Sequence, residues 1–211
     1  MARLPMFPLG TTMLPGSLLQ LHVFEPRYRE LMHAVLDEPA HAFGVVLIER
    51  GREVGGGDQR HSVGAVATVL QAASTPDGRY GVVAGVGRRL RVRQWLGDDP
   101  YPCADVEEWP DEDEPVAADE PIDLHQLLHD VNSRTHRLAA LAVEVGEPSR
   151  DQGVPLSDDP SARSYQLSWL APLGDADRYR LLCAPGPAER LRLLDELLDD
   201  AEQVLRFRLQ E

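Results

Sequence analysis

The sequence contains no lysine, because all 21 of its basic side chains are arginines. A P-loop phosphate site, a serine–lysine catalytic dyad and a Schiff-base enzyme each need a lysine amine at a defined position. The absence of lysine therefore excludes these three kinds of site from the 211 residues.

Cysteines and long apolar stretches are also scarce. Two cysteines, Cys103 and Cys183, are too few for a disulfide framework and indicate a reducing, cytoplasmic location. The uninterrupted apolar runs, such as 45–48, are short, so we expect no membrane-spanning segment and no membrane partner. The N-terminus lacks the basic and apolar regions of a secretory signal.

Basic residues are missing from the middle of the chain. Residues 94–133 carry 13 acidic residues and no arginine, whereas residues 1–93 carry 11 arginines and 8 acidic residues. The net charge of −14 opposes binding to a phosphate backbone, so we do not expect nucleic acid as a partner. We interpret the acidic, proline-rich residues 110–121 as a linker between subdomains at 1–109 and 122–211.

Residues 1–109 have the pattern of a β-rich subdomain. Alternating or β-branched runs separated by glycine and proline predict strands at 18–24, 42–49, 62–73, 79–86 and 88–96. We expect a turn at Gly85 and Gly87, and a solvent-facing row of arginines on the last strand. Many short strands of this kind favour a closed or partly closed barrel.

One helix is predicted within the β-rich part. Pro26 suits the first position of a helix, and the spacing of Tyr28, Leu31, Met32, Val35 and Leu36 places their side chains on one face. We expect the helix to end at 37–39.

The remainder of the chain has helical periodicity. Apolar stripes predict helices at 122–145, 161–171, 175–184 and 187–209, which would form a bundle of about four helices. The expected fold class is therefore α+β, with a β-rich pseudo-barrel containing one helix followed by a helical bundle.

The sequence offers no set of catalytic residues. It has no G-x-S-x-G nucleophile motif, and His125 and His129 have the spacing of a metal-binding pair but no defined third ligand. The carboxylates at 105–114 are expected to be solvated, with unshifted pKa values. We predict that the protein is not an enzyme and has no metal and no cofactor.

What remains is binding at a surface. The apolar N-terminal segment, the arginine row and the helical half could together form a groove for a polypeptide. The alternative is that the same apolar residues only fill two cores. We take six residues as candidate binding residues: Phe24, Tyr28, Arg88, Arg89, Arg91 and Arg93.

The N-terminal third resembles a known family. The segment LPMFPLGTTMLPGSLLQLHVFEPRYRELM at 4–32 is similar to the opening of the Lon protease N-terminal, substrate-binding domain. The segments at 43–56 and 61–92 resemble later elements of the same family, and so does the leucine-rich C-terminal end. We assign a structural role to five motif positions, with Glu25 paired to Arg29: Pro8, Gly16, Glu25, Pro26 and Arg27.

The resemblance implies a PUA-like pseudo-barrel, a helical bundle and a role in recognising unfolded or client polypeptides. It is a resemblance to stand-alone versions that lack the ATPase and peptidase domains, so the expected partner is a separate protease or chaperone served by an adaptor. PUA-like barrels in other families bind small ligands or RNA, and this is the alternative, with the four arginines as contacts.

Overall fold

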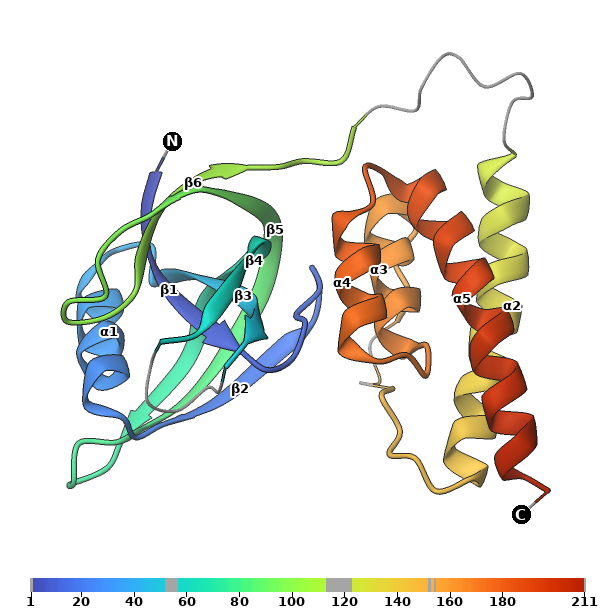
Figure 1. The fold of residues 1–211 in the computed structure, drawn as a ribbon, viewed down its shortest axis with the longest axis horizontal. Coiled ribbons are helices and arrows are strands. Elements are labelled where there is room, and N and C mark those ends of the chain that lie inside the picture. Colours follow the sequence, from blue (N-terminus) through green and yellow to red (C-terminus); the bar gives the residue numbers. More distant parts are fainter. Residues whose placement is uncertain (1, 52–56, 113–122, 152, 154, 211) are drawn as a thin grey trace. The chain divides into compact units, whose positions relative to one another are not determined.

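The computed structural model describes residues 2–51, 57–112, 123–151, 153 and 155–210. Contacts within the chain divide it into two units, Met1–Pro110 and Asp111–Glu211. We call them the β unit and the helical unit (Figure 1). Of the expected linker at 110–121, residues 113–121 lie outside the described residues.

The β unit contains six strands and one helix. The strands are β1 (Ala2–Leu9), β2 (Leu18–Val23), β3 (Ala42–Arg50), β4 (Gln59–Ser74), β5 (Tyr80–Trp95) and β6 (Cys103–Glu108). They pair in the order β2-β5-β4-β3-β1-β6, and β5 also pairs with β6. This last pairing closes β5, β4, β3, β1 and β6 into a ring, whereas β2 pairs with β5 alone (Figure 1).

β5 is one continuous strand, and the turn predicted at Gly85 and Gly87 is wrong. β4 pairs along one edge of β5, while β2 covers residues 80–85 and β6 covers residues 90–95 of the other edge. Gly85 pairs with Leu18 on one side and with Thr68 on the other. A partner strand on each side of β5 thus holds this glycine in an extended conformation and overrides its preference for turns.

β1 and β6 are absent from the sequence prediction. β1 contains Pro5 and Pro8, yet it pairs parallel with β3 and antiparallel with β6. Proline is tolerated in a strand wherever the ladder does not need its N–H group. β6 lies in the acidic stretch, but Ala104 and Val106 are buried in alternation with more exposed residues, as in other strands with one buried face.

The helix of the β unit, α1 (Pro26–Asp37), begins and ends where the sequence predicts. Tyr28, Leu31, Met32 and Val35 are buried as one face. This confirms that the chain between Phe24 and Pro39 forms a strand-to-helix junction whose apolar face joins the core.

The helical unit contains α2 (Leu124–Glu144), α3 (Pro160–Leu170), α4 (Asp175–Cys183) and α5 (Pro187–Arg208). These bounds lie within two residues of the predicted helices. The carboxylates of Asp123 and Asp159 accept hydrogen bonds from backbone N–H groups in the first turns of α2 and α3. Leucines from all four helices, Leu138, Leu167, Leu181 and Leu194 among them, form a shared buried core.

The helices α2 and α5 lie parallel to each other, and ion pairs join them. Arg134 contacts Asp195 at 2.8 Å, and Arg137 contacts Glu202 at 3.4 Å, so residues later in α2 meet residues later in α5. The two helices run side by side in the same direction (Figure 1). Among the described helices, none is long and apolar enough to cross a membrane.

A buried ion pair ties the start of the helical unit to its core. Arg190 is fully buried and donates to both carboxylate oxygens of Asp111, at 2.6 and 3.2 Å. It also donates to Ser164 Oγ and to the Tyr165 hydroxyl, each at 2.7 Å. The sequence interpretation placed Asp111 in a solvated linker, but its side chain is only 16% exposed, because Arg190 draws it into the helical unit.

Replacing Asp111 with alanine should destabilise the helical unit by about 3–5 kcal/mol, because it leaves the charge of Arg190 buried without its carboxylate. Urea denaturation followed by circular dichroism would measure this loss. The control is Glu189→Ala, which breaks an exposed ion pair with Arg192 and should change the free energy of unfolding by no more than about 1 kcal/mol. Equal effects of the two substitutions would contradict the assigned role of Asp111.

Candidate functional site

A groove of about 260 Å³ lies along β2 in the β unit. We call it the β2 groove. Its lining comes from the end of β1, from β2 and from the start of α1, and consists of Phe7, Leu9, Thr11, Leu19, Gln20, Leu21, His22, Val23, Phe24, Glu25 and Tyr28. Two of the predicted binding residues, Phe24 and Tyr28, are therefore brought together at one cavity.

The floor of the β2 groove is aromatic. The rings of Phe7 and Tyr28 stack with their centroids 4.2 Å apart, and Phe43 packs against Phe7 at 6.3 Å. Phe24, by contrast, is 52% exposed at the end of β2. Buried stacking fixes the floor, while Phe24 remains available for contact with another molecule.

The Tyr28 hydroxyl is buried at this groove without a hydrogen-bond partner. Burial raises the pKa of Tyr28 to about 12, because the phenolate would lose its hydration. A buried donor with no acceptor is uncommon in folded proteins. A residue that lines the groove thus carries a neutral, buried O–H group with no acceptor among the described residues.

Glu25 lines the groove and is paired with Arg27, which stacks on the Tyr28 ring. The guanidinium carbon of Arg27 lies 4.4 Å from the centroid of the Tyr28 ring, and its Nε donates to Glu25 at 3.2 Å. The sequence prediction assigned Arg29 as the partner of Glu25; the ion pair seen here is with Arg27. Glu25 is the one Asp, Glu or Arg among the described residues that line the groove.

A second charged cluster lies within electrostatic range of Tyr28. Arg60 donates to the carboxylates of Asp58 and Asp98 and lies 4.9 Å from the Trp95 ring. Burial opposes ionisation of Asp58, but the hydrogen bonds from Arg60 and the backbone prevail and lower its pKa. Asp58 and Arg60 are close in the sequence, but Trp95 and Asp98 are distant from them, and no local pattern predicts that these two pairs meet.

The arginine row on β5 faces solvent only in part: Arg88 and Arg93 are exposed, whereas Arg89 is buried. Arg89 is only 3% exposed and donates to the backbone carbonyls of Trp109 and Pro110. The guanidinium carbons of Arg89 and Arg91 lie 4.2 and 3.8 Å from the centroid of the Trp109 ring. The chain after β6 therefore packs over two of these arginines.

The other two arginines are paired with carboxylates of β6. Arg88 contacts Glu108 at 3.0 Å, and Arg93 forms an ion pair with Glu107. The hydrogen bond from Arg93 lowers the pKa of Glu107, although the sequence analysis expected unshifted carboxylates here. None of the four arginines lines the β2 groove, so the predicted binding residues fall into two separate groups.

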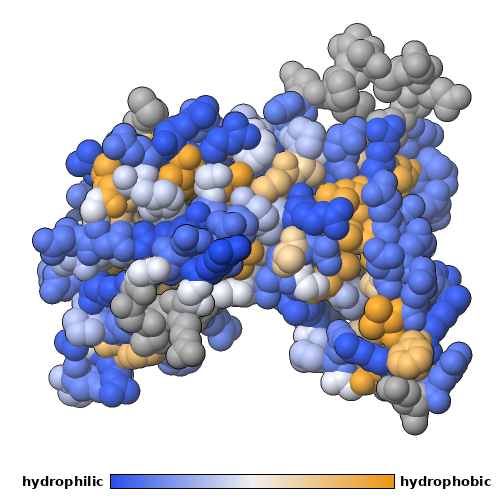
Figure 2. All heavy atoms as spheres, in the orientation of Figure 1, coloured by the Kyte–Doolittle hydropathy of each residue, from blue (hydrophilic) through white to orange (hydrophobic). Residues whose placement is uncertain are grey.

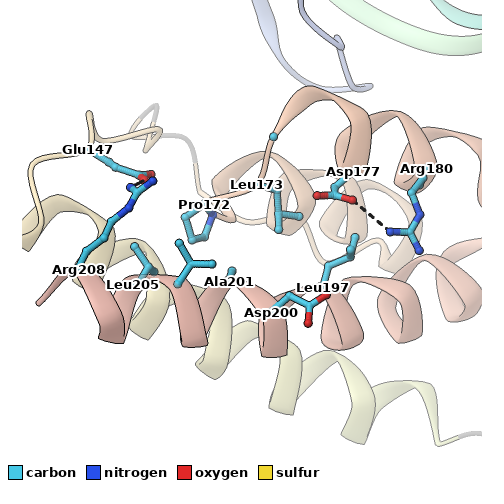
Figure 3. A pocket seen from close by; sticks show the side chains of 12 residues that line it. Glu147, Pro172, Leu173, Asp177, Arg180, Leu197, Asp200, Ala201, Leu205 and Arg208 are labelled. Carbon is cyan, nitrogen blue, oxygen red and sulfur yellow. Dashed lines mark hydrogen bonds and ion pairs between the residues drawn. The ribbon is translucent and has the colours of Figure 1, made fainter. Parts of the chain in front are cut away.

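The helical unit has a cavity of its own, of about 420 Å³ (Figure 3). α5 supplies Leu197, Ala201 and Leu205 to one wall, and the residues before α4 supply Pro172 and Leu173. Two ion pairs flank it, Glu147 with Arg208 at 2.6 Å and Asp177 with Arg180 at 3.1 Å. The sequence analysis did not identify this cavity, because the same leucines continue the buried stripe of α5.

Exposed apolar side chains gather beside this cavity. Val143, Val204, Phe207 and Leu209 are each about half exposed or more, and they lie at the C-terminal ends of α2 and α5. Figure 2 shows hydrophobic atoms near the C-terminal end of α5. Several charged residues line the cavity of the helical unit, so this cavity is less uniformly apolar than the β2 groove.

Comparison with known proteins identifies the family. Residues 3–200 match the ATP-dependent protease La (LON) substrate-binding domain. The chain belongs to the Lon substrate-binding domain family. This confirms the resemblance seen in the sequence, and the match extends across both the β unit and the helical unit.

Solved Lon domains share the fold. The crystal structure of a Lon N-terminal domain protein from Xanthomonas campestris is 26% identical, with a TM-score of 0.63, and the alignment covers 94% of this chain and 98% of that one. The N-terminal domain of the Mycobacterium avium complex Lon protease is 21% identical, with a TM-score of 0.63 and coverage of 94% and 99%. No curated protein matches the chain.

The Lon family motif lies at the joints of the β unit. Gly16 has a φ of 87°, which favours glycine, and its N–H donates to the carbonyl of Val86 at 2.8 Å. Pro8 lies in β1 opposite Val46, and Pro26 begins α1. These positions orient β1, β2 and α1, the three elements that line the β2 groove.

Replacing Tyr28 with phenylalanine should leave the free energy of unfolding unchanged or raise it by up to about 1 kcal/mol, because it removes a buried hydroxyl without a partner. The pKa in the folded protein, about 12, exceeds the ordinary value of 10.0. Because the unfolded chain releases this proton at lower pH than the folded protein, the wild type keeps its full stability below pH 10 and loses stability relative to Y28F as pH rises toward 12.

The free energy of unfolding of the wild type minus that of Y28F should therefore fall between pH 10 and pH 12. Urea denaturation of both proteins at several pH values would measure it, with phenolate absorbance as a direct readout of ionisation. A difference that stays constant across this interval would show that Tyr28 ionises as freely as in the unfolded chain.

Proposed function

We propose that this Lon-family chain binds segments of unfolded polypeptide in the β2 groove. The observation that carries the proposal is the composition of the groove: an aromatic floor, an exposed Phe24 and a lining with one carboxylate, Glu25, which is paired with Arg27. Membership in a family of substrate-binding domains supports the same role.

The dimensions of the groove favour a flexible chain as the ligand. A volume of about 260 Å³ accommodates one or two side chains rather than a folded surface. Burying one large apolar side chain contributes roughly 1.5–3 kcal/mol, so a few such contacts give reversible binding. This range suits a protein that must bind and release many sequences.

We further propose that the chain acts as an adaptor that presents client polypeptides to a separate protease or chaperone, and that its own role is binding rather than catalysis. In this proposal, residues 1–109 form a PUA-like pseudo-barrel and 122–211 a helical bundle, and the linker predicted at 110–121 is shortened at its start because Asp111 is bound by Arg190 in the helical unit. The ring of strand pairings in the β unit and the shared leucine core of the helical unit support this division.

The alternative of an RNA-binding or small-ligand module gains no support from the arginine row. Arg88 and Arg93 are matched by Glu108 and Glu107, and Trp109 covers Arg89 and Arg91. A phosphate backbone would have to displace these internal partners and approach a chain of net charge −14. The polypeptide proposal is therefore preferred.

Replacing Phe24 with serine should weaken the binding of reduced, carboxymethylated α-lactalbumin by about tenfold or more, because an apolar contact is lost. Fluorescence anisotropy of the labelled, unfolded protein would measure the dissociation constant. The matched control is Phe207→Ser, which removes a phenylalanine of the helical unit that is 65% exposed and should leave binding unchanged. Equal loss in both variants, or no loss in either, would rule out the β2 groove as the binding site.

A further inference from the structure

β2 is an edge strand with one side unpaired. It stands at the end of the strand order and pairs with β5 through residues 18–23. β6, which continues along the same edge of β5, completes the ring with β1 and leaves β2 outside it. The free edge of β2 faces the β2 groove, which explains why six consecutive residues, 19–24, line that cavity.

The backbone groups on this free edge can be assigned. The carbonyl of Ser17 accepts a hydrogen bond from the N–H of Val86 at 2.9 Å, and the antiparallel register continues without a shift from Leu18 to Val23. In such a ladder, alternate residues point both backbone groups at the partner strand. The N–H and C=O groups of Leu18, Gln20 and His22 therefore point away from β5.

These groups have no backbone partner among the described residues. Within the described part of the chain, no backbone hydrogen bond joins Leu18, Gln20 or His22 to a strand other than β5. Edge strands are usually protected from further pairing by charged residues, proline or a bulge. Residues 17–24 contain no arginine, aspartate, glutamate or proline, in a chain in which 27% of residues are charged.

The unpaired Tyr28 hydroxyl is a second, independent feature of the same place. It belongs to a side chain that is 3% exposed, lines the groove and has no hydrogen-bond partner. An open strand edge supplies N–H and C=O groups in alternation, and Tyr28, which lines the same groove, carries one further donor without an acceptor among the described residues. A polypeptide backbone is the ligand that matches both.

We propose that the client polypeptide binds as an extended strand added to the free edge of β2, with one of its polar acceptors taking the hydrogen bond of the Tyr28 hydroxyl. This rests on the proposed function and specifies the conformation of the ligand. Alternate side chains of the added strand point to opposite faces, so one set packs on Phe7 and Tyr28 and the other set points away from them. Main-chain hydrogen bonds provide most of the recognition, and the floor adds a preference for apolar residues.

The test uses a fluorescein-labelled heptapeptide of alternating threonine and valine with phenylalanine at its centre. Two analogues carry backbone N-methyl groups, one on the even and the other on the odd residues, with unchanged side chains. An added strand turns only alternate N–H groups toward β2. We therefore expect one analogue to bind at least tenfold more weakly than the parent and the other to bind within about twofold of it.

The outcomes separate this inference from the proposed function. Strand addition is wrong if both analogues bind as tightly as the parent, if both bind equally more weakly, or if the heptapeptide does not bind. Polypeptide binding still stands in these cases if carboxymethylated α-lactalbumin binds at Phe24. If neither the unfolded protein nor the heptapeptide binds, both proposals fail.

Two protein variants provide an independent check. His22→Pro removes an N–H from the free edge while the ladder to β5 does not use it, and should weaken the heptapeptide at least tenfold. Tyr28→Phe should weaken it about three- to tenfold with no loss of stability. A midpoint of urea denaturation equal to that of the wild type establishes that each variant is folded. If folded Tyr28→Phe binds the heptapeptide as tightly as the wild type does, the hydroxyl has no part in recognition. If folded His22→Pro binds it as tightly as the wild type does, strand addition is wrong.

Discussion

The architecture of the β unit depends on the length of β5, whose 16 residues serve two partners in succession along one edge. β6 takes the second half of that edge and closes the ring with β1, so β2 can occupy only the first half. Closure therefore gives each of five strands a neighbour on both sides over part of its length, whereas β2 has a neighbour on one side alone among the described strands. The site follows from this division, because the groove exists where β2 has no second neighbour.

Every basic residue of the chain is an arginine, and arginines make hydrogen bonds in the interior as well as at the surface. Arg190 holds Asp111, Ser164 and Tyr165 at once, and Arg89 reaches two backbone carbonyls while it stacks on Trp109. A guanidinium can do both because it is planar and carries five N–H donors, whereas an ammonium offers a point charge. Much of the acidic middle of the chain is thereby bound to one unit or the other.

The sequence predicts what short-range patterns determine. The start of α1 at Pro26 and the four helices of the helical unit follow from apolar spacing. The continuity of β5 through Gly85, the strand made by the proline-containing β1 and the burial of Asp111 depend instead on partners distant in sequence. Phe24 and Tyr28 could be named as candidates from the family motif, but the open edge beside them results from strand order, which no local pattern encodes.

The open edge of β2 has a consequence for selectivity. In a folded protein, nearly all backbone N–H and C=O groups already have partners. A strand edge can therefore pair with a chain that has lost, or not yet formed, its own secondary structure, and in a folded protein only with an unprotected strand edge. Under the strand-addition proposal, the groove would discriminate clients by the availability of their main chain and would need little information about their sequence. Misfolding itself would then be the recognised feature.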